Sequence, residues 1–386
     1  MSDKTRVLFT ISLLWITGVL AAGQFAKVSA GFPALRAFYP DQGASLGFLI
    51  SAVSIIGVVF GLFAGVILPR FGYKRLLVWA AILGGVLSVA QTVMPVFPVM
   101  LALRAIEGAS HLVIVVAAPT MIGQIAPLEW RNTAMTVWST VFAVAYAGFA
   151  WLGVPLIETV GFPALLWVHG LGLLGCGISL WFVLPRISAR GDRPQLRIAD
   201  VIARHRTAYQ SPYISASAFG WLFYATSFVA LVTVLPDFLP EDRRTFVSGI
   251  MPLAALLMSL TVGISMLRFL PPVTVLMVGF ASAVVAALAL LVVRDITVVS
   301  IVMLSAMGLV QAGSFAAIPA LNATAENQAL ANGALAQAGN TGNLIGTPLL
   351  LVLVDMFGFS GLVGFAAAAF GGGFAVHLWL SGRRQP

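Results

Sequence analysis

Runs of about twenty apolar residues recur along the whole chain, separated by short stretches of proline, glycine and charged residues. A bilayer core about 30 Å thick is crossed by roughly 20 helical residues, because each residue adds about 1.5 Å. About twelve such runs fit into 386 residues with short loops. We therefore predict an all-α membrane protein of twelve transmembrane helices, with spans near residues 7–30, 44–68, 75–94, 98–123, 132–156, 163–184, 213–235, 246–267, 272–292, 297–321, 330–354 and 360–380.

The composition excludes an ordinary water-soluble domain. Only 9% of the residues are charged, against roughly 25% in a typical soluble protein. The single cysteine, Cys176, lies in an apolar run and excludes an intrachain disulfide or a cysteine metal site. The net charge of +8 resides mainly in the loops, so we expect lipid and not nucleic acid as the partner of the basic residues.

A polar stretch divides the predicted spans into two sets of six. It occupies residues 186–212, between an amino-terminal bundle predicted at 1–185 and a carboxy-terminal bundle predicted at 213–386. We interpret it as a cytoplasmic linker, since its two aspartates are outnumbered by arginines at positions Arg186, Arg190, Arg193, Arg197, Arg204 and Arg206.

The basic residues also predict the orientation of the spans, because loops rich in Lys and Arg remain cytoplasmic. With the amino terminus inside, fifteen of the 21 Lys and Arg residues fall on the cytoplasmic side. We therefore predict two cytoplasmic termini in a bacterial inner membrane, with the first apolar run kept as an uncleaved span. The charged outer segment 237–246, with Asp237, Glu241 and Asp242 beside two arginines, is predicted to be a solvated turn.

The loop after the second predicted span has the sequence GVILPRFGYKR. Its glycines allow close approach and a tight turn, and its basic residues favour the cytoplasmic face. The pattern resembles the signature loop of the major facilitator superfamily, which would make it a gating loop. Pro69 stands where that family usually places an aspartate, so the charge link attributed to this aspartate is not expected here. The loop residues that carry the resemblance are Gly65, Arg70, Gly72, Lys74 and Arg75.

A second motif lies in the fourth predicted span, LALRAIEGASH, where Gly108 follows Arg104 by four residues as in the same superfamily. The antiporter motif of the fifth span is only faint in YAGFAWLGVPLIETVGF, which argues against drug efflux. The sequences of segments 22–35 and 230–240 resemble those of the cyanate-permease-like branch of the superfamily. Membership implies alternating access, in which two bundles rock about a central site at the bilayer midplane.

Three ionisable residues of the fourth span fall on one helix face, because Arg104, Glu107 and His111 are spaced by three and four residues. An ionisable group in the bilayer core costs roughly 2.5–3.5 kcal/mol or more, so each needs a partner or a function. One hypothesis is that Arg104 attracts an anionic substrate while Glu107 or His111 carries a coupling proton. The alternative is that Arg104 and Glu107 neutralise each other and His111 only packs.

Lys27 lies on the first predicted span, one turn beyond Gln24. Its amine either reaches the interface or faces the transport cavity, which the first and fourth spans line in the resembled superfamily. In the second case Lys27 and Arg104 bias the amino-terminal half towards an anion, with Gln24 as a polar neighbour.

The carboxy-terminal half offers mainly neutral groups. Aromatic and amide side chains can bind a small polar ligand without a buried charge, although core packing and interhelical hydrogen bonds explain them equally well. The candidates for substrate binding are Trp221 and Tyr224, with Phe228 on the same face, and Gln311, Gln337 and Asn340.

Several other patterns do not indicate a functional site. Gly339, Gly342 and Gly346 lie in an apolar span, which predicts close helix packing and not a phosphate loop. His169 and His377 are placed near span ends without neighbouring ligands, so no metal site or cofactor is predicted. No GxxxxGK[ST] segment occurs, so ATP-driven transport is unsupported.

We thus predict a monomeric secondary transporter for a small anionic metabolite, coupled to protons. One alternative is efflux of amphipathic drug-like compounds, which an aromatic site with one carboxylate would also serve. Another is a membrane sensor or scaffold that does not transport. An intramembrane enzyme is disfavoured, since no HExxH or GxSxG arrangement is found.

Overall fold

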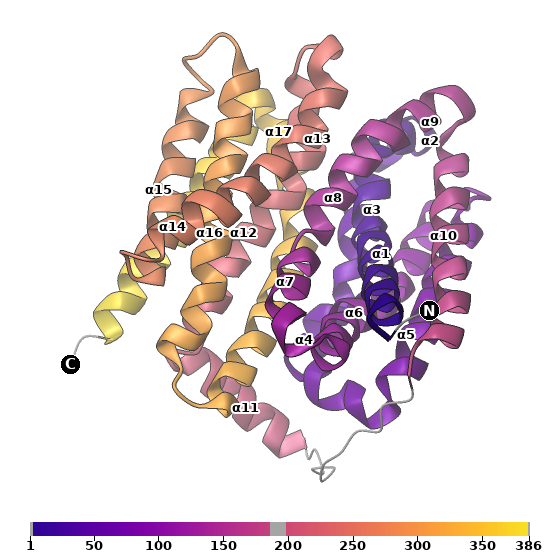
Figure 1. Ribbon diagram of the computed structural model, residues 1–386. Coiled ribbons are helices and arrows are strands. Elements are labelled where there is room, and N and C mark those ends of the chain that lie inside the picture. Colours follow the sequence, from indigo (N-terminus) through magenta and orange to yellow (C-terminus); the bar gives the residue numbers. More distant parts are fainter. Residues whose placement is uncertain (1–2, 186–197, 385–386) are drawn as a thin grey trace. The chain divides into compact units, whose positions relative to one another are not determined.

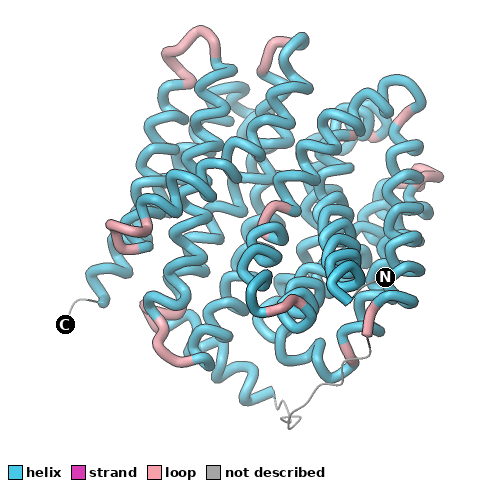
Figure 2. The backbone as a smooth tube through the Cα atoms, in the orientation of Figure 1, coloured by secondary structure: helices cyan, strands magenta, loops and turns pink. Residues whose placement is uncertain are grey.

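The computed structural model describes residues 3–185 and 198–384, and these residues form helices joined by short loops, with no strand among them (Figures 1 and 2). Eleven of the described helical segments are long and apolar enough to cross a membrane. The prediction of an all-helical membrane protein is therefore confirmed. The count of twelve spans and the side on which the termini lie remain predictions.

The described chain divides into two compact units. The first contains residues 1–40 and 63–193, and the second contains residues 41–62 and 194–386. Residues 41–62, which the sequence assigns to the amino-terminal bundle, thus pack within the second unit. The bundle boundaries at 185 and 213 remain a prediction. The linker residues 186–197 lie outside the described ranges, whereas the remainder of the linker contains a helix, α11 (Ile198–Gln210).

Among the described residues, the first unit contains four long helices, α1, α5, α6 and α10, and several short ones. The long helices of this unit cover most of the predicted spans, with ends within a few residues of those expected. Its elements are α1 (Asp3–Ala30), α2 (Phe32–Phe38), α5 (Tyr73–Gln91), α6 (Phe97–Ile125), α7 (Leu128–Trp138), α8 (Val141–Gly148), a π-helical turn (Phe149–Gly153), α9 (Val154–Val160) and α10 (Phe162–Val183). The predicted fifth span at 132–156 is therefore interrupted, and the candidate span there runs from Val141 to Val160.

The second unit surrounds its longest helix, α17 (Ala325–Arg384). Its other elements are α3 (Gly47–Ser51), α4 (Ile55–Ile67, which crosses the division at Leu62), α11, α12 (Ser215–Val234), α13 (Glu241–Met258), α14 (Ile264–Met266), α15 (Pro272–Ala289) and α16 (Ile296–Leu321). The predicted solvated turn at 237–246 is wrong for its second half, because α13 begins at Glu241. Proline at 240 stops the preceding segment, and two acidic residues in the first turn suit a helix amino terminus.

Helix α17 contains both of the last two predicted spans. A straight helix of 60 residues would be about 90 Å long, three times the bilayer core. The helix is broken at Gly358, whose φ of 58° and ψ of −136° are not helical and are readily adopted only by glycine. The break lies between the predicted spans 330–354 and 360–380.

Glycines bring helices together within each unit. A side-chain carbon at Gly342 or Gly346 of α17 would collide with the backbone of α12. The prediction that these glycines serve close packing is confirmed. In the first unit, a carbon added to Gly85 of α5 would lie 2.8 Å from the carbonyl oxygen of Gly170 of α10. This contact determines the position of the polar groups described next.

Candidate functional site

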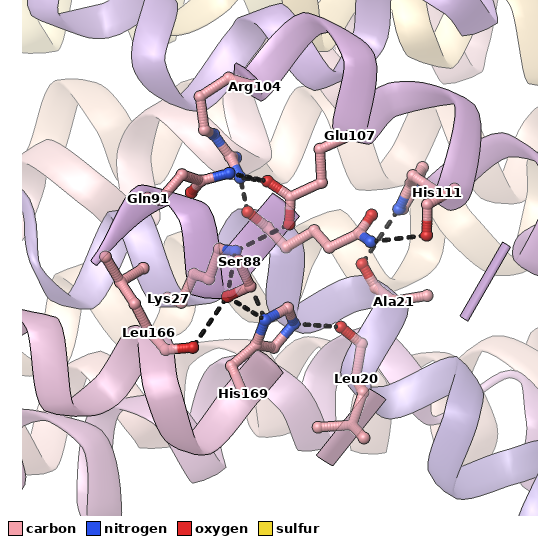
Figure 3. A network of polar contacts seen from close by, with 12 residues as sticks. Leu20, Ala21, Lys27, Ser88, Gln91, Arg104, Glu107, His111, Leu166 and His169 are labelled. Atoms are coloured by element: carbon pink, nitrogen blue, oxygen red, sulfur yellow. Dashed lines mark hydrogen bonds and ion pairs between the residues drawn. The ribbon is translucent and has the colours of Figure 1, made fainter. Parts of the chain in front are cut away.

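A buried network of charged and polar side chains joins four helices of the first unit (Figure 3). Helices α1, α5 and α6 each contribute residues three apart, which lie on one face of a helix. Helix α10 contributes one histidine. The members are Gln24 and Lys27 on α1, Ser88 and Gln91 on α5, Arg104, Glu107 and His111 on α6, and His169 on α10.

Glu107 is at the centre of this network. One carboxylate oxygen, Oε1, accepts from Lys27 Nζ at 2.7 Å. The other, Oε2, accepts from Arg104 and, at 2.8 Å, from Gln91 Nε2. Lys27, Arg104 and Glu107 are each at most 1% exposed. Two cations therefore share one carboxylate in the interior, so the three groups together carry an excess positive charge.

Arg104 bridges two helices. One of its terminal nitrogens contacts Glu107, and the other donates to the backbone carbonyl of Gln24 at 2.6 Å. This arrangement confirms that the fourth predicted span directs Arg104 and Glu107 into the protein. The ion pair considered in the sequence-based alternative is present, but it includes a second cation, Lys27.

Lys27 does not reach towards an interface, because it is fully buried. Besides Glu107, its ammonium group contacts Ser88 Oγ at 3.0 Å and His169 Nδ1 at 3.4 Å. These three contacts match the three hydrogens of an ammonium group. The close approach of α5 to α10 at Gly85 and Gly170 places Ser88, one turn further on, beside His169.

Gln24 and His111 lie at one side of the network. Gln24 Nε2 donates to Ser110 Oγ at 3.0 Å, while its buried Oε1 has no hydrogen-bond partner among the described residues. His111 Nδ1 faces the carbonyl oxygen of Ala21 at 3.0 Å, and its ring packs edge-on against Phe25 and Phe142. The contacts of His111 are thus those of a packed, singly hydrogen-bonded ring.

The aromatic residues predicted on α12 form a continuous stack in the second unit. The ring of Tyr224 lies 4.3 Å from that of Trp221 and 5.3 Å from that of Phe228, at interplanar angles of 8° and 11°. Tyr224 also donates to Gln311 Oε1 at 3.3 Å. The prediction that these rings share one helix face is confirmed, whereas their part in substrate binding remains a proposal.

The two predicted amides of α17, Gln337 and Asn340, have different partners. Gln337 accepts from the hydroxyl of Tyr209 at 2.9 Å and contacts His205 at 3.2 Å, both on α11. It also donates to the carbonyl of Val58 on α4 at 2.8 Å. Asn340 donates to the carbonyl of Ala336 within its own helix. For Gln337 the interhelical alternative is thus realised, and burial at this contact raises the pKa of Tyr209 to about 12.

The predicted gating loop is described only in part. Gly65 lies in α4 and Arg70 in a short 3-10 helix (Leu68–Phe71), and Gly72 adopts a φ of 81° immediately before α5. This positive φ explains the requirement for glycine at the turn. Lys74 Nζ donates to the carbonyl of Leu184 at 2.6 Å, just after the end of α10, whereas the cytoplasmic position of the loop remains a prediction. Arg75 is exposed.

Three members of the network were missed in the sequence. Ser88 and Gln91 lie in the third predicted span, and His169, which was assigned to a span end without partners, is 1% exposed. His169 contacts Lys27 across 142 positions of sequence, so no local spacing indicates the contact. Gln91 and His169 lie within or beside apolar spans, so the cost of burying a polar group there is the signal that marks them.

Many apolar helices together with buried ion pairs define a polytopic membrane protein of the transporter class. The chain belongs to the Major Facilitator Superfamily, whose family model matches residues 14–325. Its fold resembles that of a bacterial homologue of the human lysosomal transporter Spinster, solved in an inward-facing, unoccupied conformation. The TM-score is 0.70 at 12% identity, over 99% of this chain and 95% of that one.

Two curated relatives share part of the sequence. The 4-hydroxybenzoate transporter PcaK of Pseudomonas aeruginosa is 26% identical over an alignment 277 residues long, which covers 62% of this chain and 61% of that protein. PcaK of Pseudomonas putida is 31% identical over 159 residues, which are 41% of this chain and 35% of the relative. The chain therefore matches less than two thirds of the length of either relative. The chain is a transporter of this superfamily and not an enzyme, while the cyanate-permease-like branch remains a prediction.

Proposed function

We propose that this transporter moves a small organic anion across the bacterial inner membrane by alternating access, coupled to protons. The observation that carries the proposal is the excess positive charge of the buried network, where Lys27 and Arg104 share Glu107. A buried charge without a full counter-charge is costly, and an anionic ligand would offset that cost. The names of the two relatives supply the first compound to test, 4-hydroxybenzoate.

Arg104 and Lys27 are the groups we assign to the carboxylate of the substrate. Arg104 carries a planar fork of donors, which matches a carboxylate, and Lys27 is a point charge. Gln24 offers Oε1, a buried acceptor, for a ligand donor group. For an aromatic substrate, we assign ring contacts to the stack formed by Trp221, Tyr224 and Phe228, with Gln311, Gln337 and Asn340 as polar neighbours.

Glu107 is our candidate for the residue that couples transport of the anion to protons. All three of its contacts described here are donors, so it acts as an ionised carboxylate in this arrangement. A substrate anion that shares Arg104 or Lys27 with Glu107 would change the balance of charge around this carboxylate and so link anion binding to protonation within the network. His111 is the second candidate, although its ring contacts favour a packing role.

The proposal is tested by uptake of labelled 4-hydroxybenzoate into proteoliposomes that contain the purified protein. We expect accumulation driven by an inward proton gradient, which a protonophore abolishes. Arg104→Lys should weaken uptake about tenfold at limiting substrate, because a single ammonium group cannot replace the fork. Tyr213→Phe, a change outside the network, is the matched control. Absence of uptake for 4-hydroxybenzoate and for a panel of small carboxylates would refute the anion proposal.

The coupling step has its own test. Glu107→Gln should lose accumulation driven by the proton gradient, while exchange of internal for external substrate persists. Retention of full proton-driven accumulation would remove Glu107 from the coupling step. Drug susceptibility of a deletion strain distinguishes efflux, since an importer of small anions leaves resistance unchanged.

The finer architecture belongs to the same proposal. We propose twelve spans in a monomer, with both termini cytoplasmic, because the break at Gly358 falls between the last two predicted spans. The basic linker and the basic carboxy-terminal residues Arg383 and Arg384 support this orientation.

A further inference from the structure

His169 is a buried histidine that contacts the ammonium group of the site without taking part in its ion pairs. It lies on α10 and is 1% exposed. Its two ring nitrogens have different neighbours, and those neighbours determine where hydrogens can be placed (Figure 3). We propose that His169 Nδ1 is the site at which the transported proton is held while the anion is bound. This inference rests on the proposed proton-coupled transport of an anion.

The hydrogens around His169 can be assigned from acceptors that cannot donate. Nε2 faces the carbonyl of Leu20 at 2.8 Å, so Nε2 carries a hydrogen. Ser88 Oγ lies 2.9 Å from the carbonyl oxygen of Leu166 and 2.9 Å from His169 Nδ1, and its single hydroxyl hydrogen can serve only one of these two acceptors. When the hydrogen serves Leu166, the contact between His169 Nδ1 and Ser88 Oγ has no hydrogen while His169 is neutral.

A proton on Nδ1 completes this contact. The new N–H bond donates to Ser88 Oγ, whose two lone pairs then accept from His169 and from Lys27, while its hydroxyl still donates to Leu166. The proton comes from water on the side from which it is loaded, and no other bond is broken. The ion pairs of Glu107 remain in place, which is not true when Glu107 itself is protonated.

The same proton releases a hydrogen of Lys27. In the neutral arrangement, Nδ1 is an acceptor for the third Lys27 hydrogen at 3.4 Å, and a protonated Nδ1 no longer accepts it. That hydrogen becomes available to a carboxylate of the substrate. Proton and anion therefore favour each other's binding, and this linkage is reciprocal.

The charges around His169 oppose one another, and burial of the ring disfavours its charged form. Lys27 of α1 and Arg104 of α6 oppose a positive imidazolium, and Glu107 of α6 favours it. The other elements in contact present uncharged groups, Ser88 from α5 and the ring of Phe149 from the π-helical turn. An anion bound to the two cations reduces their opposition, so protonation at His169 follows anion binding.

The test compares two buried histidines in the full-length protein. His169→Gln retains an acceptor and removes the titratable ring, whereas His377→Gln alters a buried histidine of the second unit whose ring nitrogens have no hydrogen-bond partner among the described residues. We expect His169→Gln to lose more than about tenfold of proton-driven accumulation and to lose the pH dependence of 4-hydroxybenzoate binding, because both depend on protonation of the ring. His377→Gln should keep both. Proton-driven accumulation at the wild-type level in His169→Gln would overturn the inference.

A measurement on the unaltered protein covers the case in which His169→Gln does not fold. In protein labelled with ¹⁵N-histidine, the His169 resonances should change from a ring protonated at Nε2 alone to one protonated at both nitrogens when 4-hydroxybenzoate is added. Resonances that stay those of the neutral ring with the anion bound would overturn the inference. If the wild type transports no anion under a proton gradient, the proposed function fails, and that result is distinct from either outcome for His169.

Discussion

At the scale of single residues, the charge of the buried network determines what each substitution does. Glu107 is the one carboxylate that Lys27 and Arg104 share. Removing Lys27 leaves a balanced pair of opposite charges, whereas removing the charge of Glu107 leaves two buried cations. Breaking a buried pair so that a charge is left uncompensated costs about 3–5 kcal/mol. The two substitutions are therefore unequal, although each removes the same contact.

We expect Glu107→Gln to destabilise the protein in detergent more than Lys27→Met does. Because Lys27→Met removes one of the two opposing cations, the double variant should melt at a higher temperature than Glu107→Gln alone. The measurement is the melting midpoint of the four proteins in a double-mutant cycle. Additive shifts of the midpoint would contradict the shared-carboxylate arrangement.

At the scale of elements, small residues set the distance between helices. Gly346 of α17 faces the backbone of Thr226 on α12, whereas a side-chain carbon added to Gly371 of the same helix would lie in open space. Both glycines are helical, so the intrinsic preference for alanine, about 1 kcal/mol, is the same at each position. The difference between them isolates the packing of α12 against α17.

We expect Gly346→Ala to lower the melting midpoint, because the added methyl group forces α12 and α17 apart. Gly371→Ala should leave the midpoint unchanged or raise it, because it adds helix preference without a collision. The two variants are compared by tryptophan fluorescence during heating in detergent. Equal shifts would show that α17 does not approach α12 closely at Gly346.

A second prediction at this scale concerns the amino terminus of α16. Asp295 caps the helix by accepting from the backbone N–H of Thr297 at 3.0 Å, and it pairs with Arg243 of α13 at 2.9 Å. These contacts hold the pKa of Asp295 below its ordinary value, and the contacts with Thr297 have the largest effect. The stabilisation is therefore fully present above that ordinary value, near pH 4, and is lost as the pH falls through the lower folded-state pKa.

Accordingly, Asp295→Ala should melt below the wild type at neutral pH, and the difference should close as the pH falls below the ordinary value for an aspartate. Asp242→Ala is the comparison variant, because its oxygen lies 3.9 Å from the same arginine and accepts no capping hydrogen bond, although its charge also lies in the first turn of a helix. The midpoints are measured across a pH series in one detergent. A difference that persists unchanged in acid would show that the ionised carboxylate of Asp295 does not carry the stabilisation.

At the scale of the whole molecule, hydropathy and the family motifs predicted the helical class, the superfamily and the inward face of α6. Those features depend on patterns within one helix or one loop. The contacts of Lys27 with Ser88 and His169 join residues 61 and 142 positions apart, and they depend on tertiary packing. The helical start of α13 at Glu241 was missed for another reason, because charge was taken as a sign of a loop although acidic residues are favoured at a helix amino terminus.

The number of times that the chain crosses the membrane is also a property of the whole molecule. It depends on whether α17 forms one span or two. If the break at Gly358 separates two spans, Asp355 lies on the outer side, and the two ends of the chain lie together on the inner side. Single cysteines introduced as Lys4→Cys, Asp355→Cys and Gly382→Cys would then differ in their reaction with a membrane-impermeant maleimide. The background is Cys176→Ser, which removes the native thiol. In intact cells we expect labelling of Asp355→Cys alone, with labelling of the other two after permeabilisation. Labelling of Gly382→Cys but not Lys4→Cys in intact cells would show an odd number of crossings.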